Sequence, residues 1–310
     1  MSKWIAGHQP VLDFHTGLLA KLWVVSRRDG FPPTRGTLLL HDLDTLQERG
    51  SRTIQIPNPR GQNTKGIRLV RGRIQPDQLF TAGPVVCGDW DDVRRALVTL
   101  ADGEKGLYKL SDRRIRALRR AFPPSRKFKD VAELNIALLR FILPRIGIPV
   151  PRIVRLSDLL GQRNWQRNIL TVLKDLNSWG NAIRRADGRV SSIPFWAWDK
   201  QEQKRLPVGS VSQALILAQR GQLIPQAAPL VYIVRCRLKR PMVRGTGGAK
   251  YEKPLERAAR QQRWRIARAV TITSTQGCPA AWLSPKGFRP SALLLWLMGG
   301  NFDPRQIERS

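Results

Sequence analysis

Cysteine is scarce in this sequence, and the few cysteines are not paired. Three of them, Cys87, Cys236 and Cys278, are scattered over 310 residues. None belongs to a C-x-x-C pair, the spacing typical of a structural zinc site. An odd and sparse set argues against a disulfide framework and favours a reducing compartment. We therefore predict a cytoplasmic protein.

Long apolar segments are also missing. No uninterrupted apolar run reaches about 18 residues, the length that a membrane-spanning helix requires. The most apolar window, from Ser291 to Met298, is too short to cross a bilayer. The first residues, Met1 to Ile5, lack the hydrophobic segment of a signal peptide. The sequence therefore predicts no membrane partner.

Acidic residues are few relative to basic ones. The chain has 23 Asp and Glu against 54 Lys and Arg, which gives a formal net charge of +31. With 42% hydrophobic residues it can still bury a core. A polyphosphate offsets the self-repulsion of such a chain by contacting Lys and Arg and releasing counterions, whereas Arg-rich codon usage is the alternative explanation. We predict a nucleic-acid partner, DNA in preference to RNA, and further proteins of a nucleoprotein assembly.

Histidine is as scarce as cysteine, and no familiar catalytic motif contains it. His8, His15 and His41 form neither an H-x-H nor an H-E-x-x-H pair, which argues against a rolling-circle nickase or a zincin. The acidic clusters at 42–44 and 89–92 resemble Mg²⁺ ligands in composition, but such residues more often cap helices or lie on exposed faces. We therefore predict no catalytic residues and no metal.

Four segments differ in their patterns. In the first, Thr53–Ile56 and Ile67–Val70 alternate apolar and polar residues and predict a hairpin, preceded by a helix from Asp42 to Glu48. The predicted division is a candidate N-terminal winged-helix-like domain (1–75), a basic helical linking region (76–129), a winged-helix DNA-binding domain (130–200) and a basic α/β region (201–310).

Segment 130–200 has the clearest pattern. Asp130 and Glu133 predict a capped helix, 153–156 predicts a strand, and 157–160 predicts a short helix before Gly161. A second amphipathic helix begins at Asn164, and its apolar residues recur on one face through Trp179. This order resembles the winged-helix domains of plasmid replication initiators, and that resemblance implies a DNA-reading helix.

The polar face of that helix contains the candidate DNA-contacting residues. Arg163, Asn164 and Arg167 are predicted to read bases, because Arg suits guanine edges and Asn suits adenine edges. An Asp187-Gly188 turn predicts a hairpin over 182–193, which would act as the wing. The residues predicted to bind phosphate are Lys174, Arg184, Arg185, Arg189, Arg244, Lys250 and Arg260.

The last segment has two features of its own. The aromatic run 195–198 is predicted to be core, with stacking on bases as the alternative, and 231–238 predicts a strand. The glycine-rich segment from Arg244 to Lys250 lacks the phosphate-loop motif, because Tyr251 stands where that motif requires Ser or Thr. We therefore predict no cofactor.

Two other functional classes remain open. Basic charge spread along the whole chain fits an RNA-binding subunit of a ribonucleoprotein. In addition, Gly7-His8-Gln9-Pro10, with Gly17 and Lys21, resembles the N-terminal signature of putative sugar-modifying enzymes from O-antigen gene clusters. That resemblance implies that His8, Gln9 and Lys21 line a nucleotide or sugar pocket.

Taken together, the sequence predicts an α+β fold with winged-helix modules and a basic α/β C-terminal region. The predicted function is non-catalytic, sequence-directed DNA binding in replication initiation or its control. The two alternatives are an RNA-binding subunit and a sugar-modifying enzyme of surface polysaccharide biosynthesis.

Overall fold

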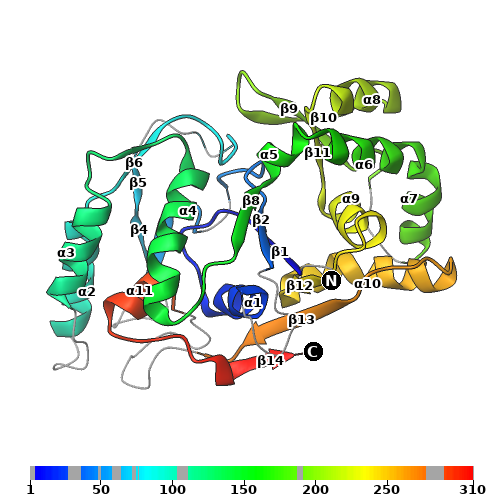
Figure 1. Cartoon of the computed structure of the whole chain (residues 1–310). Helices are drawn as coiled ribbons and strands as arrows, with labels where there is room; N and C mark the ends of the chain where they lie inside the picture. Colours follow the sequence, from blue (N-terminus) through cyan, green and yellow to red (C-terminus); the bar gives the residue numbers. More distant parts are fainter. Residues whose placement is uncertain are drawn as a thin grey trace.

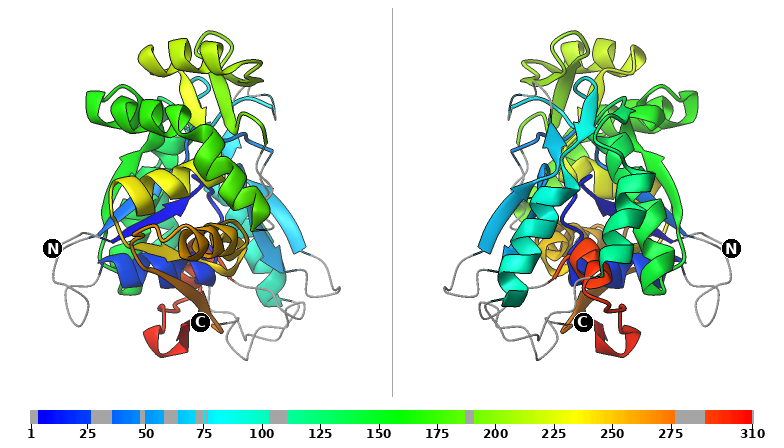
Figure 2. Two further views of the ribbon diagram at one scale, coloured as in Figure 1. Left: turned by 90° about the vertical axis from the view of Figure 1, so that its right-hand side faces the viewer. Right: turned by 90° about the vertical axis from the view of Figure 1, so that its left-hand side faces the viewer.

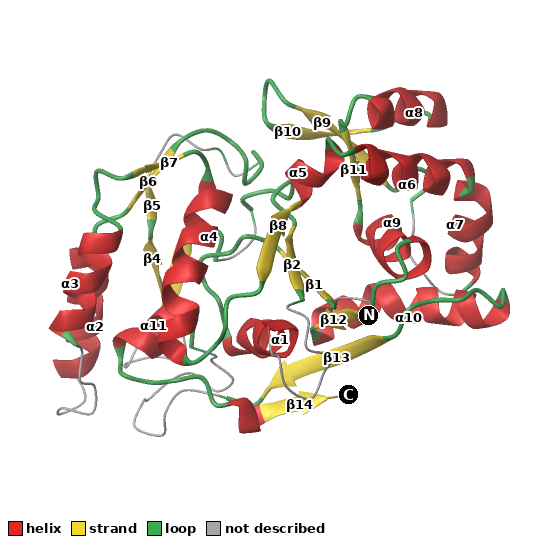
Figure 3. Cartoon of the chain, in the orientation of Figure 1, coloured by secondary structure: helices red, strands yellow, loops and turns green. Residues whose placement is uncertain are grey.

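The computed structural model describes most of the chain. The described residues are 4–26, 36–47, 50–57, 64–71, 75, 77–102, 111–186, 191–276 and 290–309. Helices and strands are mixed throughout these residues, as the sequence predicts (Figure 3). Within the same ranges, none of the helices has both the length and the hydropathy to cross a membrane.

A six-stranded sheet lies at the centre, in the order β14-β13-β12-β1-β2-β8 (Figure 1). Its first five strands in chain order run parallel, and β14 pairs antiparallel with β13. Counted along the chain and read from β8 to β14, the strand order is 3-2-1-4-5-6, which is that of a doubly wound sheet. The strands are β1 (Ile5–His8), β2 (Thr37–Leu40), β8 (Arg152–Arg155), β12 (Met242–Arg244), β13 (Ala269–Ser274) and β14 (Ile307–Arg309).

Both faces of the sheet are buried. Alternate residues of a strand point to opposite faces, and in β2 Leu38 and Leu40 join one core cluster while Leu39 joins the other. In β12, Val243 and Met242 divide between the two clusters in the same way. Helices must therefore cover each face to exclude water from both clusters.

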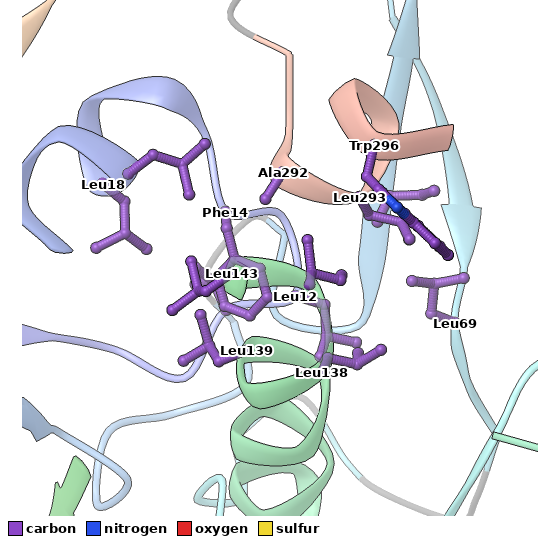
Figure 4. Close-up of a cluster of buried hydrophobic side chains, with 14 of the residues drawn as sticks. Leu12, Phe14, Leu18, Leu69, Leu138, Leu139, Leu143, Ala292, Leu293 and Trp296 are labelled. Atoms are coloured by element: carbon purple, nitrogen blue, oxygen red, sulfur yellow. The ribbon is translucent and has the colours of Figure 1, made fainter. Parts of the chain in front are cut away.

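The first face is covered by α1 and neighbouring helices. Leu12 and Phe14, which precede α1, lie among leucines of α4 and residues of α11 (Figure 4). The side chain of Asp130 accepts a hydrogen bond from the Glu133 N–H at 2.8 Å, which confirms the predicted cap of α4. The helical elements on this side are α1 (Thr16–Ser26), α2 (Trp90–Asp102), α3 (Asp112–Ala121), α4 (Val131–Ile142), a 3₁₀ turn (Leu143–Ile146) and α11 (Ala292–Leu297).

The second face is covered by the helices between β8 and β13. Their apolar residues form the second core cluster together with Leu39 and Met242. These elements are α5 (Leu156–Leu160), α6 (Arg163–Lys174), α7 (Leu176–Arg185), α8 (Val211–Gln219), α9 (Ala227–Tyr232), a π-helical turn (Ile233–Arg237) and α10 (Thr246–Gln261).

Three small antiparallel sheets and a 3₁₀ turn (Pro304–Gln306) complete the described elements. The sheet formed by residues 195–199, 204–207 and 223–225 lies with α8 at one end of the molecule (Figure 2). The predicted hairpin in the first segment is present, with Ile54 opposite Ile67, but its second strand is Thr64–Arg68 instead of Ile67–Val70, and Val70 pairs in a different sheet. The sheets are β3 (Thr53–Pro57) with β4 (Thr64–Arg68), β5 (Val70–Arg71) with β6 (Val85–Cys87) and β7 (Lys127–Phe128), and β10 (Lys204–Pro207) with β9 (Phe195–Asp199) and β11 (Leu223–Pro225).

Three predicted elements are wrong. Residues 182–185, predicted as a strand of the wing, belong to helix α7, because Ala182 and Ile183 share its buried face with Trp179. Turns replace the helix predicted from Asp42, and residues 231–238 form helical turns instead of a strand. The central sheet also takes strands from three of the four segments into which the sequence was divided.

Candidate active site

A cavity of about 550 Å³ opens at the carboxyl ends of the parallel strands. His8 and Gln9 line it at the end of β1, and His41 follows β2. Arg244 ends β12, and Thr246 begins α10 on the adjoining wall. The strand order reverses direction between β1 and β12, and crevices at this point of a doubly wound sheet are the usual ligand sites of such folds.

All three histidines of the chain line this one cavity. The His8 and His15 rings meet edge to face, with centroids 6.3 Å apart. His41 lies against the backbone of β1 at Gly7, where a Cβ atom would be 2.9 Å from its Nε2. Because that distance is shorter than carbon and nitrogen atoms tolerate, Gly7 is what lets the His41 ring occupy this position.

Lys21 brings a positive charge into the cavity from α1. Its side chain is 7% exposed, its stem passes beside Gly245, and its Nζ donates to the Gly7 carbonyl at 3.3 Å. No carboxylate of the described residues lies within ion-pair distance of it. Burial lowers the pKa of Lys21 to about 8, so the amine still carries a proton at neutral pH.

The imidazoles of His8 and His41 are uncharged at neutral pH. Burial, helped by the Lys21 charge, lowers the pKa of His8 well below its ordinary value. Burial also lowers the pKa of His41 to about 4, although Asp44 acts in the opposite direction. The His8 Nδ1 is 2.8 Å from the Gln9 carbonyl, which can only accept, so the proton is on Nδ1 and Nε2 keeps its lone pair.

Asp44 connects two walls of the site. Its carboxylate accepts from the Gln9 amide at 2.5 Å and from the Arg205 guanidinium at 2.7 Å. Arg205 comes from β10, far along the chain, so this carboxylate joins the loop after β1 to the sheet of β9, β10 and β11. Both of its oxygens are therefore engaged, and Gln9 is held in place.

The loop after β1, which carries Gln9 and His15, is anchored to the core. Two of its own side chains, Leu12 and Phe14, are buried and point into the cluster drawn in Figure 4. The buried amide of Asn135, on α4, donates to the Val11 carbonyl of the same loop. A loop that is packed and hydrogen-bonded at several points holds its polar side chains in defined positions.

Arg244, predicted to bind phosphate, is engaged in a buried ion-pair network. Its guanidinium donates to Glu252 at 2.9 Å, Glu256 at 3.3 Å and the Thr271 hydroxyl at 2.8 Å. Arg235, which is 2% exposed, shares both carboxylates at 3.0 Å and 2.9 Å. Two arginines and two glutamates cancel in charge, so Arg244 helps to shape the cavity wall and contributes little net charge to it.

A second ion-pair network lies beside β2 and β8. The Arg155 guanidinium donates to Asp42 at 2.6 Å and to Asp130 at 2.7 Å. The backbone N–H of Ser157 also donates to Asp42, at 3.0 Å, while burial raises the pKa of Asp42. This network connects the start of α4 with the strand ends next to the cavity.

The residues predicted to read DNA are exposed on α6. Arg163, Asn164 and Arg167 lie on the polar face of that helix, while Trp165 and Ile169 are buried on the other. The predicted amphipathic pattern is therefore present at this position. The three side chains are far in sequence from the histidines and do not line the cavity.

The remaining predicted phosphate ligands fall in several places. Lys174 on α6, Arg184 and Arg185 on α7 and Arg260 on α10 are exposed. Arg184 also donates to the Asn181 side chain at 2.6 Å. Lys250 belongs to α10, and nothing is described of its side chain, while Arg189 lies outside the described residues.

Sequence motifs did not indicate this constellation. His8 and His15 lie at the two ends of the loop after β1, and His41 joins them because β1 and β2 are neighbours in the sheet. The resemblance to sugar-modifying enzymes, in contrast, implied His8, Gln9 and Lys21, and all three line the cavity. Among the described residues, no group of three His, Cys, Asp or Glu is arranged to hold a metal ion.

Comparisons with known proteins add little. The sequence matches no family model and no curated protein. Among solved structures, the chain is similar to the tyrosyl-tRNA synthetase from Aeropyrum pernix, with 14% sequence identity and a TM-score of 0.32. The match covers 94% of this chain and 58% of the synthetase chain, which is less than two thirds of it. Nothing about function follows from a similarity of this degree.

Proposed function

We propose that this protein is an enzyme that binds a phosphorylated small molecule in the cavity and acts on it by proton transfer. One observation carries the proposal: all three histidines of the chain and the buried Lys21 meet in a single cavity of about 550 Å³. Cavities of this size with a few convergent polar groups and shifted pKa values are typical of active sites.

The electrostatics favour an anion. Lys21 contributes a buried positive charge without a carboxylate partner among the described residues. Thr246 begins the 16-residue helix α10 at the same wall, so backbone N–H groups and the positive end of the helix dipole also favour an anionic group there. A phosphate group can pair with the Lys21 charge and accept hydrogen bonds from the N–H groups at the start of α10.

The histidines supply the proton chemistry in this proposal. His8 Nε2 has a free lone pair in the tautomer set by Gln9, so it can accept a proton from a bound substrate. A bound dianion would raise the low pKa values of His8 and His41 toward neutrality, because nearby negative charge favours the protonated imidazole. His8, Gln9 and Lys21 are also the residues that the resemblance to sugar-modifying enzymes implied for a nucleotide or sugar pocket.

Calorimetric titration with inorganic pyrophosphate tests the proposal. The Lys21→Met variant should lose affinity by about a hundredfold or more, since a hydrogen-bonded charge pair in a buried site is worth several kcal/mol. Lys253→Met is the matched control, because Lys253 is exposed on α10, and it should bind as the unaltered protein does. Equal affinities of the two variants would refute the assigned role of Lys21.

The α6–α7 surface supports a second candidate, sequence-directed DNA binding in replication initiation or its control. Arg163, Asn164 and Arg167 are all exposed on one face of α6. In a winged-helix arrangement α6 would enter the major groove, and the β9–β10 hairpin, which follows α7, would take the place of the wing predicted at 182–193. Shape-directed RNA binding by the same basic surface is the alternative.

A further inference from the structure

A smaller cavity of about 270 Å³ lies directly beside the first. Its wall combines the loop after β2, the start of α5, the sheet of β9, β10 and β11, and the beginning of α9. His41 and Asp44 line both cavities, as do Ala227 and Leu230. Groups bound in the two cavities would therefore share one imidazole and one carboxylate as neighbours.

Trp196 provides a flat apolar wall in the smaller cavity. In β9, Phe195 and Ala197 are buried on one side, and the partly exposed Trp196 and Trp198 occupy the other. Of the two tryptophans, Trp196 lines the cavity. The Arg205 guanidinium lies 5.4 Å from the centre of the Trp196 ring and is fixed by its bond to Asp44. The ring is thus held in position from the β10 side.

The remaining walls are apolar, with a few hydrogen-bonding groups. Leu43, Leu156 and Ile224 contribute the apolar surface, while Gln226 and His41 contribute polar atoms. A nucleobase has apolar faces and a hydrogen-bonding edge, so it matches such a wall. A free sugar, whose hydroxyl groups surround the ring, would leave several of them against apolar surface without partners.

We propose that the smaller cavity binds a second substrate through a nucleobase stacked on Trp196. Its role as a second substrate rests on the proposed function, because the first substrate is the phosphorylated ligand beside Lys21. His41 and Asp44 stand between the two, so the reacting groups of both ligands would meet at these side chains.

The test measures binding of adenosine, which has the ring but no phosphate, by calorimetric titration. Trp196→Ala should weaken adenosine binding about tenfold or more, the usual effect of removing a stacking ring. Trp198→Ala is the matched control, because Trp198 is on the same face of β9 but outside the cavity, and it should bind normally. Trp196→Phe, which keeps a ring, should retain most of the affinity and guards against a folding defect in the alanine variant.

Several results would overturn the second site. These are no saturable adenosine binding to the unaltered protein, equal losses in the Trp196→Ala and Trp198→Ala variants, or tighter binding of methyl glucoside than of adenosine. Pyrophosphate binding by the Lys21→Met variant shows separately whether the proposed function holds. If pyrophosphate affinity does not depend on Lys21 while adenosine affinity depends on Trp196, the first proposal fails and the second site stands.

Discussion

Basic side chains occur in two contrasting environments in this molecule. Around the sheet edge, Lys21, Arg155, Arg235 and Arg244 are buried or nearly so, and each has a defined neighbour. On the α6–α7 surface, Arg163 and its neighbours are exposed to water. A large net charge therefore does not by itself locate function, because part of it is used inside the structure.

The two environments differ in what a single charge can do. At the sheet edge the dielectric response is weak, so removal of one charge leaves its partners without compensation. On an exposed helix face, water and salt screen each charge, and neighbouring residues can replace it. We expect large and specific effects in the first region and small, additive effects in the second.

The largest expected difference concerns stability. Arg155→Met should lower the free energy of unfolding by about 3–5 kcal/mol, because it leaves buried Asp42 and Asp130 without their cation. Arg163→Met, on exposed α6, should change it by no more than about 0.5 kcal/mol. Urea denaturation of the two variants measures both quantities. Comparable losses in the two variants would contradict the distinction between the regions.

A pH series tests the buried charge of Lys21. Because its pKa is about 8, affinity for sulfate, whose own charge is constant in this range, should fall about tenfold per pH unit above pH 8. The Lys21→Arg variant, which keeps its charge, should show no such fall. Stability should move the other way: the unfolded chain keeps the proton up to its ordinary pKa, so the free energy of unfolding rises between pH 8 and about 10.5. Sulfate affinity that stays flat across this range in the unaltered protein would refute the assignment.

Local patterns in the sequence predicted several elements correctly. The cap at Asp130, the short helix before Gly161 and the amphipathic start of α6 are all present, because each depends on residues a few positions apart. The first strand of the hairpin predicted over 182–193 is wrong for a tertiary reason, while its turn at Asp187-Gly188 lies outside the described residues. Ala182 and Ile183 pack as part of α7 against the second core, which outweighs the local turn signal.

Local sequence patterns could not predict which residues meet in the candidate site. His8 and His41 are separated by a whole crossover, and only the parallel pairing of His8 with Leu40 brings them together. Arg205 reaches Asp44 across 161 positions of sequence. Nothing in the spacing of these residues indicates contact, whereas the β1 segment with Gly7 could be singled out because its residues are contiguous. The remaining contacts of the site are set by the order of the strands in the sheet, and that order depends on the complete set of strand pairings.

The smallest expected effects concern the exposed surface and its candidate DNA contacts. Arg163→Ala should reduce the preference for a selected DNA site about fivefold or more, because one base contact is worth roughly 1–3 kcal/mol. Arg185→Ala, on exposed α7, should leave the preference intact and lower the slope of log affinity against log salt by about 0.9, the value for one phosphate contact. Gel-shift titrations at several salt concentrations, with RNA as competitor, measure both. If Arg163→Ala alters only the salt slope, α6 binds the backbone without reading bases; if RNA competes more strongly than DNA, the surface serves the RNA-binding alternative.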